Sequence, residues 1–320
     1  MKVAELIRRR EGSWRELEQM CERFRKTRRK PDEVAKFAKL YRAACAGLAL
    51  SDAYQLPPST VDYLHLLVAR AHNQLYRSKS FPWQRMVDLI LIETPRKIFH
   101  EPCVHIAFFL FWGLFALGGY LAYEQTIWPT FAEDVVGAEA LDNVNSMYAQ
   151  AGERGWGENS AMMGYYIWNN AGIGIRVFVE MLLVLPGLVE LTFNAVYLGS
   201  IFGYMFRPEL GQASLNFKEF VTAHGPYELT AIILSAGGGL KIGMGWIITD
   251  GLTRMDSLKK KAKEALPIVM CAVVLFFLAA MIEGFISPSP APWWMKGLIG
   301  ALSSCSLMVY FIVLGYQGRP

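Results

Sequence analysis

The pattern of apolar and polar positions divides the chain into two parts. In the first part apolar residues recur at helical spacing, and Trp14, Leu17, Cys21 and Phe24 form one such stripe. After residue 103 the apolar residues instead form runs of about 20 residues, the length that a helix needs to cross a bilayer. The chain is therefore predicted to be all-α, with an amphipathic helical bundle followed by a polytopic helical membrane domain.

Three amphipathic helices are predicted in residues 1–80, which we interpret as a cytoplasmic helical head. The first is expected to start at Ser13, because Ser13 and Glu16 match a capping box. The second follows Pro31, and the third covers about residues 60–77. None of the three is apolar enough to cross a bilayer, so they are expected to pack against one another as a small bundle.

Residues 81–103 have an intermediate pattern, which mixes Trp83, a Leu/Ile run and basic residues. Such a mixture suits an amphipathic helix that lies in the membrane interface just before the first crossing. A helix buried in the core of the head is the competing interpretation, and the sequence alone does not separate the two.

Residues 104–320 contain six runs that are long and apolar enough to be transmembrane helices. They are predicted at 104–124, 166–186, 187–206, 226–248, 267–286 and 297–316. The second and third runs are separated only by Pro186-Gly187, so one long kinked helix or a re-entrant pair is an alternative. Four or five crossings are for this reason also compatible with the pattern.

The charge of the connecting segments predicts the side of the membrane on which each one lies. Residues 1–103 hold 20 Lys and Arg against 12 Asp and Glu, although the whole chain carries a net charge of only +4. The segment 125–165 has six acidic residues and one Arg, whereas 249–266 has five basic residues. Because basic segments stay in the cytoplasm, 125–165 is expected to be an external loop. Both termini are expected on the cytoplasmic side of the cell membrane.

Composition and spacing argue against several other classes of function. Basic residues of the head alternate with acidic ones, which is typical of a solvated helix face, so no nucleic-acid partner is expected. The five cysteines form no C-x-x-C pair and are expected to be reduced. Around His224 the H-E-x-x-H spacing is missing, and no convincing nucleophile–base pair is found. The protein is therefore expected not to be an enzyme and to hold neither a cofactor nor a metal.

Polar and ionisable residues are frequent in the predicted crossings, where an ionisable one costs about 2.5–3.5 kcal/mol. The set consists of Asn169, Asn170, Arg176, Glu180, Glu190, Asn194, His224, Glu228, Lys241 and Glu283. Arg176 and Glu180 lie four residues apart and are expected to neutralise each other within one helix. The set as a whole either specifies helix packing or lines a polar cavity between helices, and the sequence leaves both open.

The sharpest local feature is the segment Ala223–Leu229, with the sequence AHGPYEL. Proline is favoured in the first turn of a helix, so Pro226 is expected to start the fourth crossing. His224 would then lie at the cap, within reach of Glu228 in the first turn.

Small residues mark positions where two helices approach closely. The candidates for such packing are Gly199, Gly203, Gly225, Gly238 and Gly284. Such small-residue faces can also pack against a second copy of the chain, so a homodimer is compatible with the sequence.

Three stretches resemble the stage II sporulation protein M family of bacterial membrane proteins. They are HGPYELTAIILSAGGGLKIG from His224, NAVYLGSIFG from Asn194 and IEGFISP from Ile282. The positions that match the family pattern are Asn170, Asn194, Gly199, His224, Gly225, Glu228, Glu283 and Gly284. In the head, LYRAAC and YLHLLVARAHNQLYR are similar to the cytoplasmic region of longer members. The resemblance implies a polytopic membrane protein, and the family takes its name from a membrane partner of cell-wall hydrolases.

Two functions are compatible with these features. The first is a membrane scaffold in cell-envelope processes, surrounded by the lipid bilayer, with protein partners that dock on the segment 125–165 and on the head. The second is a transporter or channel for a small solute, an ion or a lipid, because helices interrupted near Pro186 and Pro226 are similar to those of transporter sites.

Overall fold

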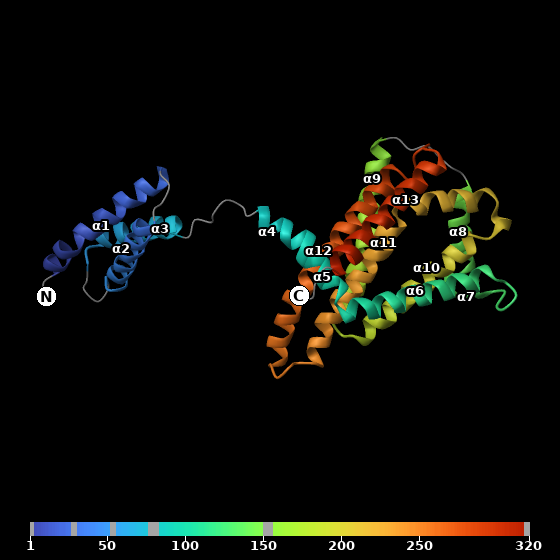
Figure 1. Ribbon diagram of the computed structural model, residues 1–320, viewed down its shortest axis with the longest axis horizontal. Helices are drawn as coiled ribbons and strands as arrows, with labels where there is room; N and C mark the ends of the chain where they lie inside the picture. The colour runs from blue at the N-terminus through green and yellow to red at the C-terminus, as the bar shows by residue number, and fades with distance from the viewer. Residues whose placement is uncertain (1–2, 27–30, 52–55, 76–82, 150–155, 317–320) are drawn as a thin grey trace. The chain divides into compact units, whose positions relative to one another are not determined.

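The computed structural model describes residues 3–26, 31–51, 56–75, 83–149 and 156–316. All regular elements within these residues are helices (Figure 1), so the all-α class is confirmed. The chain separates into two compact units, Met1–Trp83 and Gln84–Pro320. The division lies close to the domain boundary predicted after residue 80, and each unit is described by itself.

The first unit is a bundle of three helices, α1 (Val3–Lys26), α2 (Pro31–Ala49) and α3 (Pro58–Leu75). Each of the three helices contacts the other two. Their apolar stripes meet in a core that includes Trp14, Leu17, Met20, Phe37, Leu64 and Leu67. The side chain of Phe24, which was expected on the first stripe, lies outside the described residues.

The predicted start of the first helix is wrong. Ser13 lies in the middle of α1, and its hydroxyl donates a hydrogen bond to the carbonyl of Arg10 at 2.7 Å instead of capping a helix. The first turns of α1 are rich in charged residues, which are good helix formers but give no apolar periodicity. The helix therefore begins about ten residues before its apolar stripe does.

The segment before the first crossing is helical and belongs to the second unit. It consists of α4 (Trp83–Asp88), a π-helical turn (Leu89–Glu93) and α5 (Thr94–Phe99). The hydroxyl of Tyr310 donates a hydrogen bond of 2.6 Å to the carbonyl of Ile90, which ties the segment to the last helix of that unit. The competing interpretation, a core helix of the head, is therefore wrong, whereas the interfacial position stays a prediction.

The described residues of the second unit contain six long helices. They are α6 (Pro102–Tyr123), α9 (Trp156–Met181), α10 (Leu185–Met205), α11 (Gln212–Gly243), α12 (Arg254–Phe285) and α13 (Trp293–Met308). Short 3₁₀ turns precede and follow α11 (Pro208–Leu210 and Met244–Trp246). Beyond α13, a π-helical turn (Val309–Val313) leads into α14 (Leu314–Tyr316).

By length and composition, five helices of the described residues can cross a membrane. They are α6, α10, α11 with its 3₁₀ extension, α12, and α13 with its continuation to Tyr316. The helix α9 covers the second predicted crossing but is not among the five. Its sequence is interrupted by polar residues such as Glu158, Asn169 and Asn170, which lower its apolar character. The polytopic class is thus confirmed, with one such helix fewer than the six crossings predicted.

Close contacts at glycines show that the long helices alternate in direction along the chain. Phe115 of α6 lies against Gly199 of α10, and one turn further on Gly119 lies against Gly203, so these two helices are parallel. Figure 1 shows them side by side and inclined to the other long helices. Along the chain α9 lies between these two parallel helices, and it runs in the direction opposite to both.

The remaining helices pack around α11. The helix α9 runs parallel to α11, since Gly174 lies near Ser235 and Phe178 lies near Gly239. The helix α12 runs antiparallel to α11, and α13 runs parallel to it. Every residue of α11 from 231 to 240 is buried. This stretch forms the centre of the main apolar core, to which α6, α9, α10 and α12 also contribute.

The predicted external loop 125–165 is largely helical. It contains α7 (Phe131–Val136) and α8 (Ala138–Ala149), and α9 begins within it at Trp156. The ring of Tyr148 lies 5.2 Å from that of Phe217 in α11, and the Asn216 amide donates a hydrogen bond of 2.7 Å to the carbonyl of Tyr148. The helix α8 is therefore fixed against α11.

Pro226 does not start a helix, contrary to the prediction. It lies inside α11, which begins 14 residues earlier at Gln212. A proline within a helix leaves the carbonyl four residues before it without its usual donor, and here that residue is Thr222. A Cβ added to Gly300 of α13 would overlap this carbonyl. The missing side chain of Gly300 thus lets α13 pack closely against the interrupted turn.

The helices α9 and α10 are separate. Leu182, Leu183 and Val184 form a turn between them, so a single kinked helix over 166–206 is excluded. Gly187 lies directly against Met181, where a side chain would overlap the backbone. The tight connection therefore depends on this glycine.

Candidate functional site

The polar residues of α11 lie in two groups on either side of its buried apolar stretch, residues 231–240. We call the first group the His224 cluster, which consists of Asn170, His224, Glu228, Glu283 and Ser287. We call the second the Lys241 cluster, which consists of Glu101, Lys241 and Glu264. The structure thus separates Lys241 from the other polar residues with which the sequence had grouped it.

The His224 cluster is built from facing surfaces of α11 and the end of α12. His224 and Glu228 lie one turn apart on α11, with His224 Nε2 at 3.6 Å from Glu228 Oε2. His224 Nδ1 lies 3.0 Å from Ser287 Oγ, just beyond the end of α12. One ligand atom from each of His224, Glu228 and Glu283 lies within 4.8 Å of the others. The predicted proximity of His224 and Glu228 is therefore present, although His224 lies within the helix and not at a cap.

Helix α9 closes the cluster through two asparagines. The Asn170 amide donates a hydrogen bond of 3.0 Å to Glu283 Oε2, and the Asn169 amide donates one of 2.9 Å to Asn170 Oδ1. Asn170 and Glu283 are only 6% and 7% exposed. The approach of the two helices depends on Gly284, where a Cβ would lie 2.8 Å from Met163 Cβ. Four predicted residues, Asn169, Asn170, Gly284 and Glu283, thus meet at one contact.

A pocket of about 480 Å³ adjoins this cluster. Its walls come from α8, α9, α11, the α12–α13 connection and the start of α13. The lining residues include Tyr148, Tyr165, Tyr166, Asn170, Asn216, Glu219, Phe220, Glu283, Ser287 and Lys296. Lys296 Nζ lies 4.0 Å from Glu219 Oε2, and the Lys296 side chain is buried. The pocket therefore combines aromatic surface with charges of both signs.

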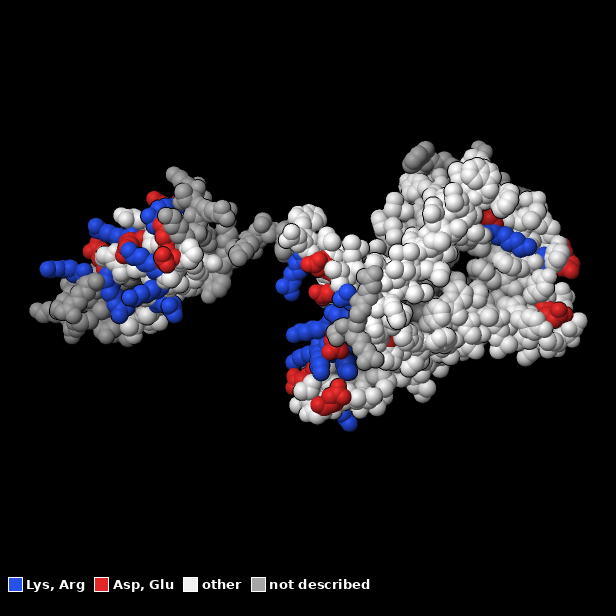
Figure 2. Space-filling view, viewed as in Figure 1, with Lys and Arg blue, Asp and Glu red and all other residues white. Residues whose placement is uncertain are grey.

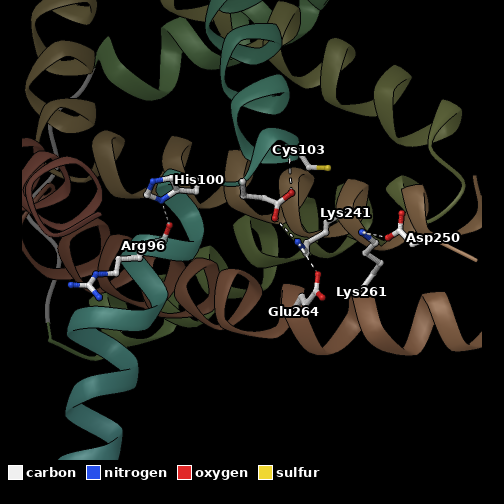
Figure 3. Close-up of polar contacts among 8 residues, drawn as sticks. Arg96, His100, Cys103, Lys241, Asp250, Lys261 and Glu264 are labelled. Carbon is white, nitrogen blue, oxygen red and sulfur yellow. Dashed lines mark hydrogen bonds and ion pairs between the residues drawn. The ribbon is translucent and has the colours of Figure 1, made fainter. Parts of the chain in front are cut away.

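The Lys241 cluster joins three helices at the other end of α11. Lys241 Nζ lies 2.5 Å from Glu101 Oε2 and 3.1 Å from Glu264 Oε2. Glu101 also caps α6, because its carboxylate accepts a hydrogen bond from the Cys103 amide. Figure 3 shows Lys241 and Glu264 pointing toward each other, with Lys261 and Asp250 forming a separate pair nearby. This cluster therefore ties the start of α6 to the end of α11 and to the first turns of α12.

Charge is distributed unevenly between the two ends of the second unit. Figure 2 shows Lys and Arg side chains gathered near α4, α5 and the connection between α11 and α12. The basic residues of this connection and of the first turns of α12 are Arg254, Lys259, Lys260, Lys261 and Lys263. The Lys241 cluster lies at this basic end, whereas the His224 cluster and its pocket lie at the opposite end.

Four other predicted residues lie away from both clusters. Arg176 does not pair with Glu180 as expected but faces Glu190 of α10, with Nε at 3.9 Å from Oε1. Within α10, the Asn194 amide donates hydrogen bonds to the carbonyl of Glu190 at 2.8 Å and to its carboxylate at 3.1 Å. The contact between Arg176 and Glu190 connects α9 with α10, and none of the four residues is part of the pocket lining.

The glycine predictions hold with one exception. A Cβ on Gly199 or Gly203 would overlap backbone atoms of α6, and one on Gly238 would lie 2.8 Å from Val269 Cγ2. Gly284 packs against α9 as described above. No atom of another described helix lies within 4 Å of a Cβ added to Gly225, so its prediction as a helix-packing residue is wrong.

Ser287, Lys296, Glu101 and Glu264 were not predicted as site residues. All four lie within about three residues of a predicted boundary of a crossing, where the sequence indicates interfacial or loop residues. The carboxylates of Glu101 and Glu264 lie in sequence segments that are rich in basic residues. A search for a counter-charge to the lone Lys241 would have been the available signal, because a buried charge needs a partner.

Comparison with known protein families agrees with this architecture. A family model described as Stage II sporulation protein M matches residues 106–288, which is more than half of the chain. A second model, described as Domain of unknown function (DUF8413), matches residues 4–77. No curated protein and no solved structure matches the chain. The first match includes every residue of the His224 cluster, and the chain belongs to the stage II sporulation protein M family of membrane proteins.

Proposed function

We propose that this protein is a non-enzymatic membrane scaffold whose pocket, at the end opposite the basic residues, receives a segment of a partner protein of the cell envelope. The observation that carries the proposal is the pocket of about 480 Å³, which combines three tyrosines with the buried carboxylate of Glu283. Tyrosine is enriched where proteins bind other proteins, because its ring offers a large apolar surface and its hydroxyl a hydrogen bond.

The arrangement of the helices supports an external position for the pocket. Basic connections stay in the cytoplasm, which assigns the connection between α11 and α12 to the inside. From the alternating helix directions we infer that α9 crosses as well, which gives six crossings. The pocket, α7 and α8 lie on the outside in this topology, and the start of α6 and the end of α14 lie on the cytoplasmic side.

The size and chemistry of the pocket define the kind of partner. A volume of this size accommodates a few side chains and not a folded domain. Glu283 favours a basic side chain, and the tyrosines favour apolar or aromatic neighbours. We therefore expect a short segment with one basic residue next to an apolar one.

The competing function, a transporter or channel, is disfavoured by the packing of α11. This helix is in direct contact with its neighbours at three successive glycines. Gly237 lies against Val104, Gly238 against Val269 and Gly239 against Phe178. In the described residues the pocket lining contains none of the residues from 231 to 240. A path between the two polar clusters would have to open this close contact between helices.

Site-specific photocrosslinking in cells tests the proposal. A photoreactive phenylalanine at Tyr165 lies in the pocket lining, and the same group at Trp168 of the same helix is a matched control outside it. We expect a discrete crosslinked product from position 165 and none from 168. Mass spectrometry should identify an envelope protein, and the Glu283→Gln variant should reduce the yield.

Two results would contradict this function. A crosslink from Tyr165 only to a second copy of this chain would indicate a homodimer interface in place of a partner site. Solute flux through liposomes that is lost in Glu283→Gln, measured against empty liposomes, would instead support transport.

A further inference from the structure

Three side chains of the His224 cluster present metal-ligand atoms to one another. These atoms of His224, Glu228 and Glu283 lie within 4.8 Å of one another, and they come from two helices that pack side by side. His224 and Glu283 are buried, and the side chain of Glu228 is 17% exposed. We propose that this triad binds one first-row divalent transition-metal ion, such as Zn²⁺ or Mn²⁺.

The distances suit a single ion. Nitrogen and oxygen ligands lie at about 2.0–2.2 Å from Zn²⁺, so two ligands at a tetrahedral angle are about 3.4 Å apart. His224 Nε2 and Glu228 Oε2 are 3.6 Å apart. The three ligand atoms all lie within 4.8 Å of one another, so small side-chain rotations are enough to bring Glu283 to coordination distance as well.

Residues around the triad orient it in the way that metal ligands require. A metal-bound histidine usually engages its other ring nitrogen in a hydrogen bond, which fixes the ring and its tautomer. His224 Nδ1 lies 3.0 Å from Ser287 Oγ. When Nδ1 carries the proton, the lone pair of Nε2 faces Glu228. Asn170 in turn donates to Glu283 Oε2 and holds that carboxylate toward the centre.

The ligand set defines the class of metal. One imidazole nitrogen with two carboxylates suits Zn²⁺, Mn²⁺ or Fe²⁺, whereas Mg²⁺ and Ca²⁺ prefer oxygen ligands alone. The two carboxylates also need a positive charge when they approach each other away from water. Glu283 lines the pocket, so an ion held here has access from outside. The sequence predicted no metal because Glu283 is 59 positions from His224 along the chain.

A proton shared by the two carboxylates is the competing occupant, because it also relieves the repulsion between them. Lys296 offers a positive charge in the same pocket, but its amine lies beside Glu219 at 4.0 Å. A measurement of metal binding distinguishes these possibilities. Saturable uptake of a metal ion is not expected if a shared proton or Lys296 neutralises the carboxylates.

Equilibrium dialysis of the full-length chain tests the proposal. The protein is purified in detergent with a histidine-free affinity tag, treated with a chelator, and dialysed against Zn²⁺, Mn²⁺, Mg²⁺ or Ca²⁺. Bound metal is measured by mass spectrometry. We expect about one equivalent of Zn²⁺ or Mn²⁺ per chain and a higher unfolding temperature with the metal. Mg²⁺ and Ca²⁺ should bind much more weakly.

The variants define the site. His224→Gln, Glu228→Gln and Glu283→Gln should each remove saturable binding, and Ser287→Ala should weaken it by roughly 10–100-fold. The matched controls are Glu219→Gln, which changes a carboxylate of the same helix and pocket, and His105→Gln, which changes an exposed histidine of α6. Both controls should bind metal like the wild type.

Two outcomes would overturn the proposal. One is the absence of saturable Zn²⁺ and Mn²⁺ binding by the wild type, which needs no variant to interpret. The other is binding that the three ligand variants retain. The measurement requires no protein partner, so its failure leaves the pocket proposal standing, and failure of the crosslinking experiment leaves the metal site standing.

Discussion

The two polar clusters of α11 hold charged groups of the same kinds but satisfy them in different ways. In the Lys241 cluster one ammonium group lies between two carboxylates, and the three residues lie where the start of α6 meets α11 and α12. In the His224 cluster two carboxylates meet a histidine next to a pocket. In the first arrangement the charged groups are paired with one another, whereas the second arrangement faces a space that a ligand can enter. Comparing them indicates which polar residues serve packing and which serve binding.

The largest effect is expected from Lys241→Met. This change removes the only amine of the Lys241 cluster and leaves Glu101, with a side chain 11% exposed, without its charge partner. Breaking a buried pair in this way costs about 3–5 kcal/mol. Chemical denaturation in detergent micelles should show a loss of this order.

Lys261→Met is the control for that loss. Lys261 pairs with Asp250 at 3.7 Å, and the Asp250 side chain is 53% exposed. An exposed pair of this kind contributes only about 0–1 kcal/mol. Equal losses for the two variants would show that the Lys241 cluster is no more important for stability than a surface ion pair.

An intermediate effect is expected from Gly284→Ala. The new methyl group would lie 2.8 Å from Met163 Cβ and push α9 away from α12, at a cost of about 1–3 kcal/mol. The same movement should weaken the hydrogen bond from Asn170 to Glu283 and lower crosslinking from Tyr165.

Gly225→Ala is its matched control beside His224. No atom of another helix lies within 4 Å of the added methyl group. Alanine favours a helix by about 0.5–1 kcal/mol over glycine, but the following Pro226 disfavours helical backbone at a residue with a Cβ. Thermal unfolding should therefore change much less than in Gly284→Ala. A loss as large as that of Gly284→Ala would mean that close packing extends to this side of the His224 cluster.

A smaller effect is expected from Asn170→Ala. Its amide donates to Glu283, and loss of a buried hydrogen bond costs about 1 kcal/mol when water can replace the donor. Water can enter here because both residues line the pocket. Asn169→Ala, at an exposed position, should change the unfolding temperature less. A loss of stability as large as that of Lys241→Met would indicate that the His224 cluster serves only to stabilise the fold.

The sequence predicted the class of the fold because apolar runs and helical stripes are local signals. The stripe through Trp14 and Leu17 and the later apolar runs identify most helices of the structure. Helix boundaries were less predictable, since charged turns such as those before Ser13 form a helix without an apolar pattern. The prediction that Pro226 starts a helix was wrong for a related reason. A proline inside a helix is tolerated where another helix approaches the freed carbonyl, and that approach is visible only in three dimensions.

The candidate site was predictable in part. The spacing of His224 and Glu228 is a helical signal, and both residues meet as predicted. The partners of Arg176, Lys241 and Glu283 come from other helices, and no sequence spacing reports such contacts. Arg176 therefore faces Glu190 in place of Glu180, and Lys241 lies away from the remaining set.

The smallest effect is expected within the Lys241 cluster itself, from Glu264→Gln. The Glu264 side chain is 39% exposed, so its pair with Lys241 contributes only about 0–1 kcal/mol. Glu101→Gln should cost more in the same denaturation experiment, because Glu101 is 11% exposed and also caps α6. Equal losses of stability would show that both carboxylates contribute equally to the cluster. Unequal losses would show that Glu101 is the main partner of Lys241, and that the contact between α6 and α11 is what this cluster chiefly holds.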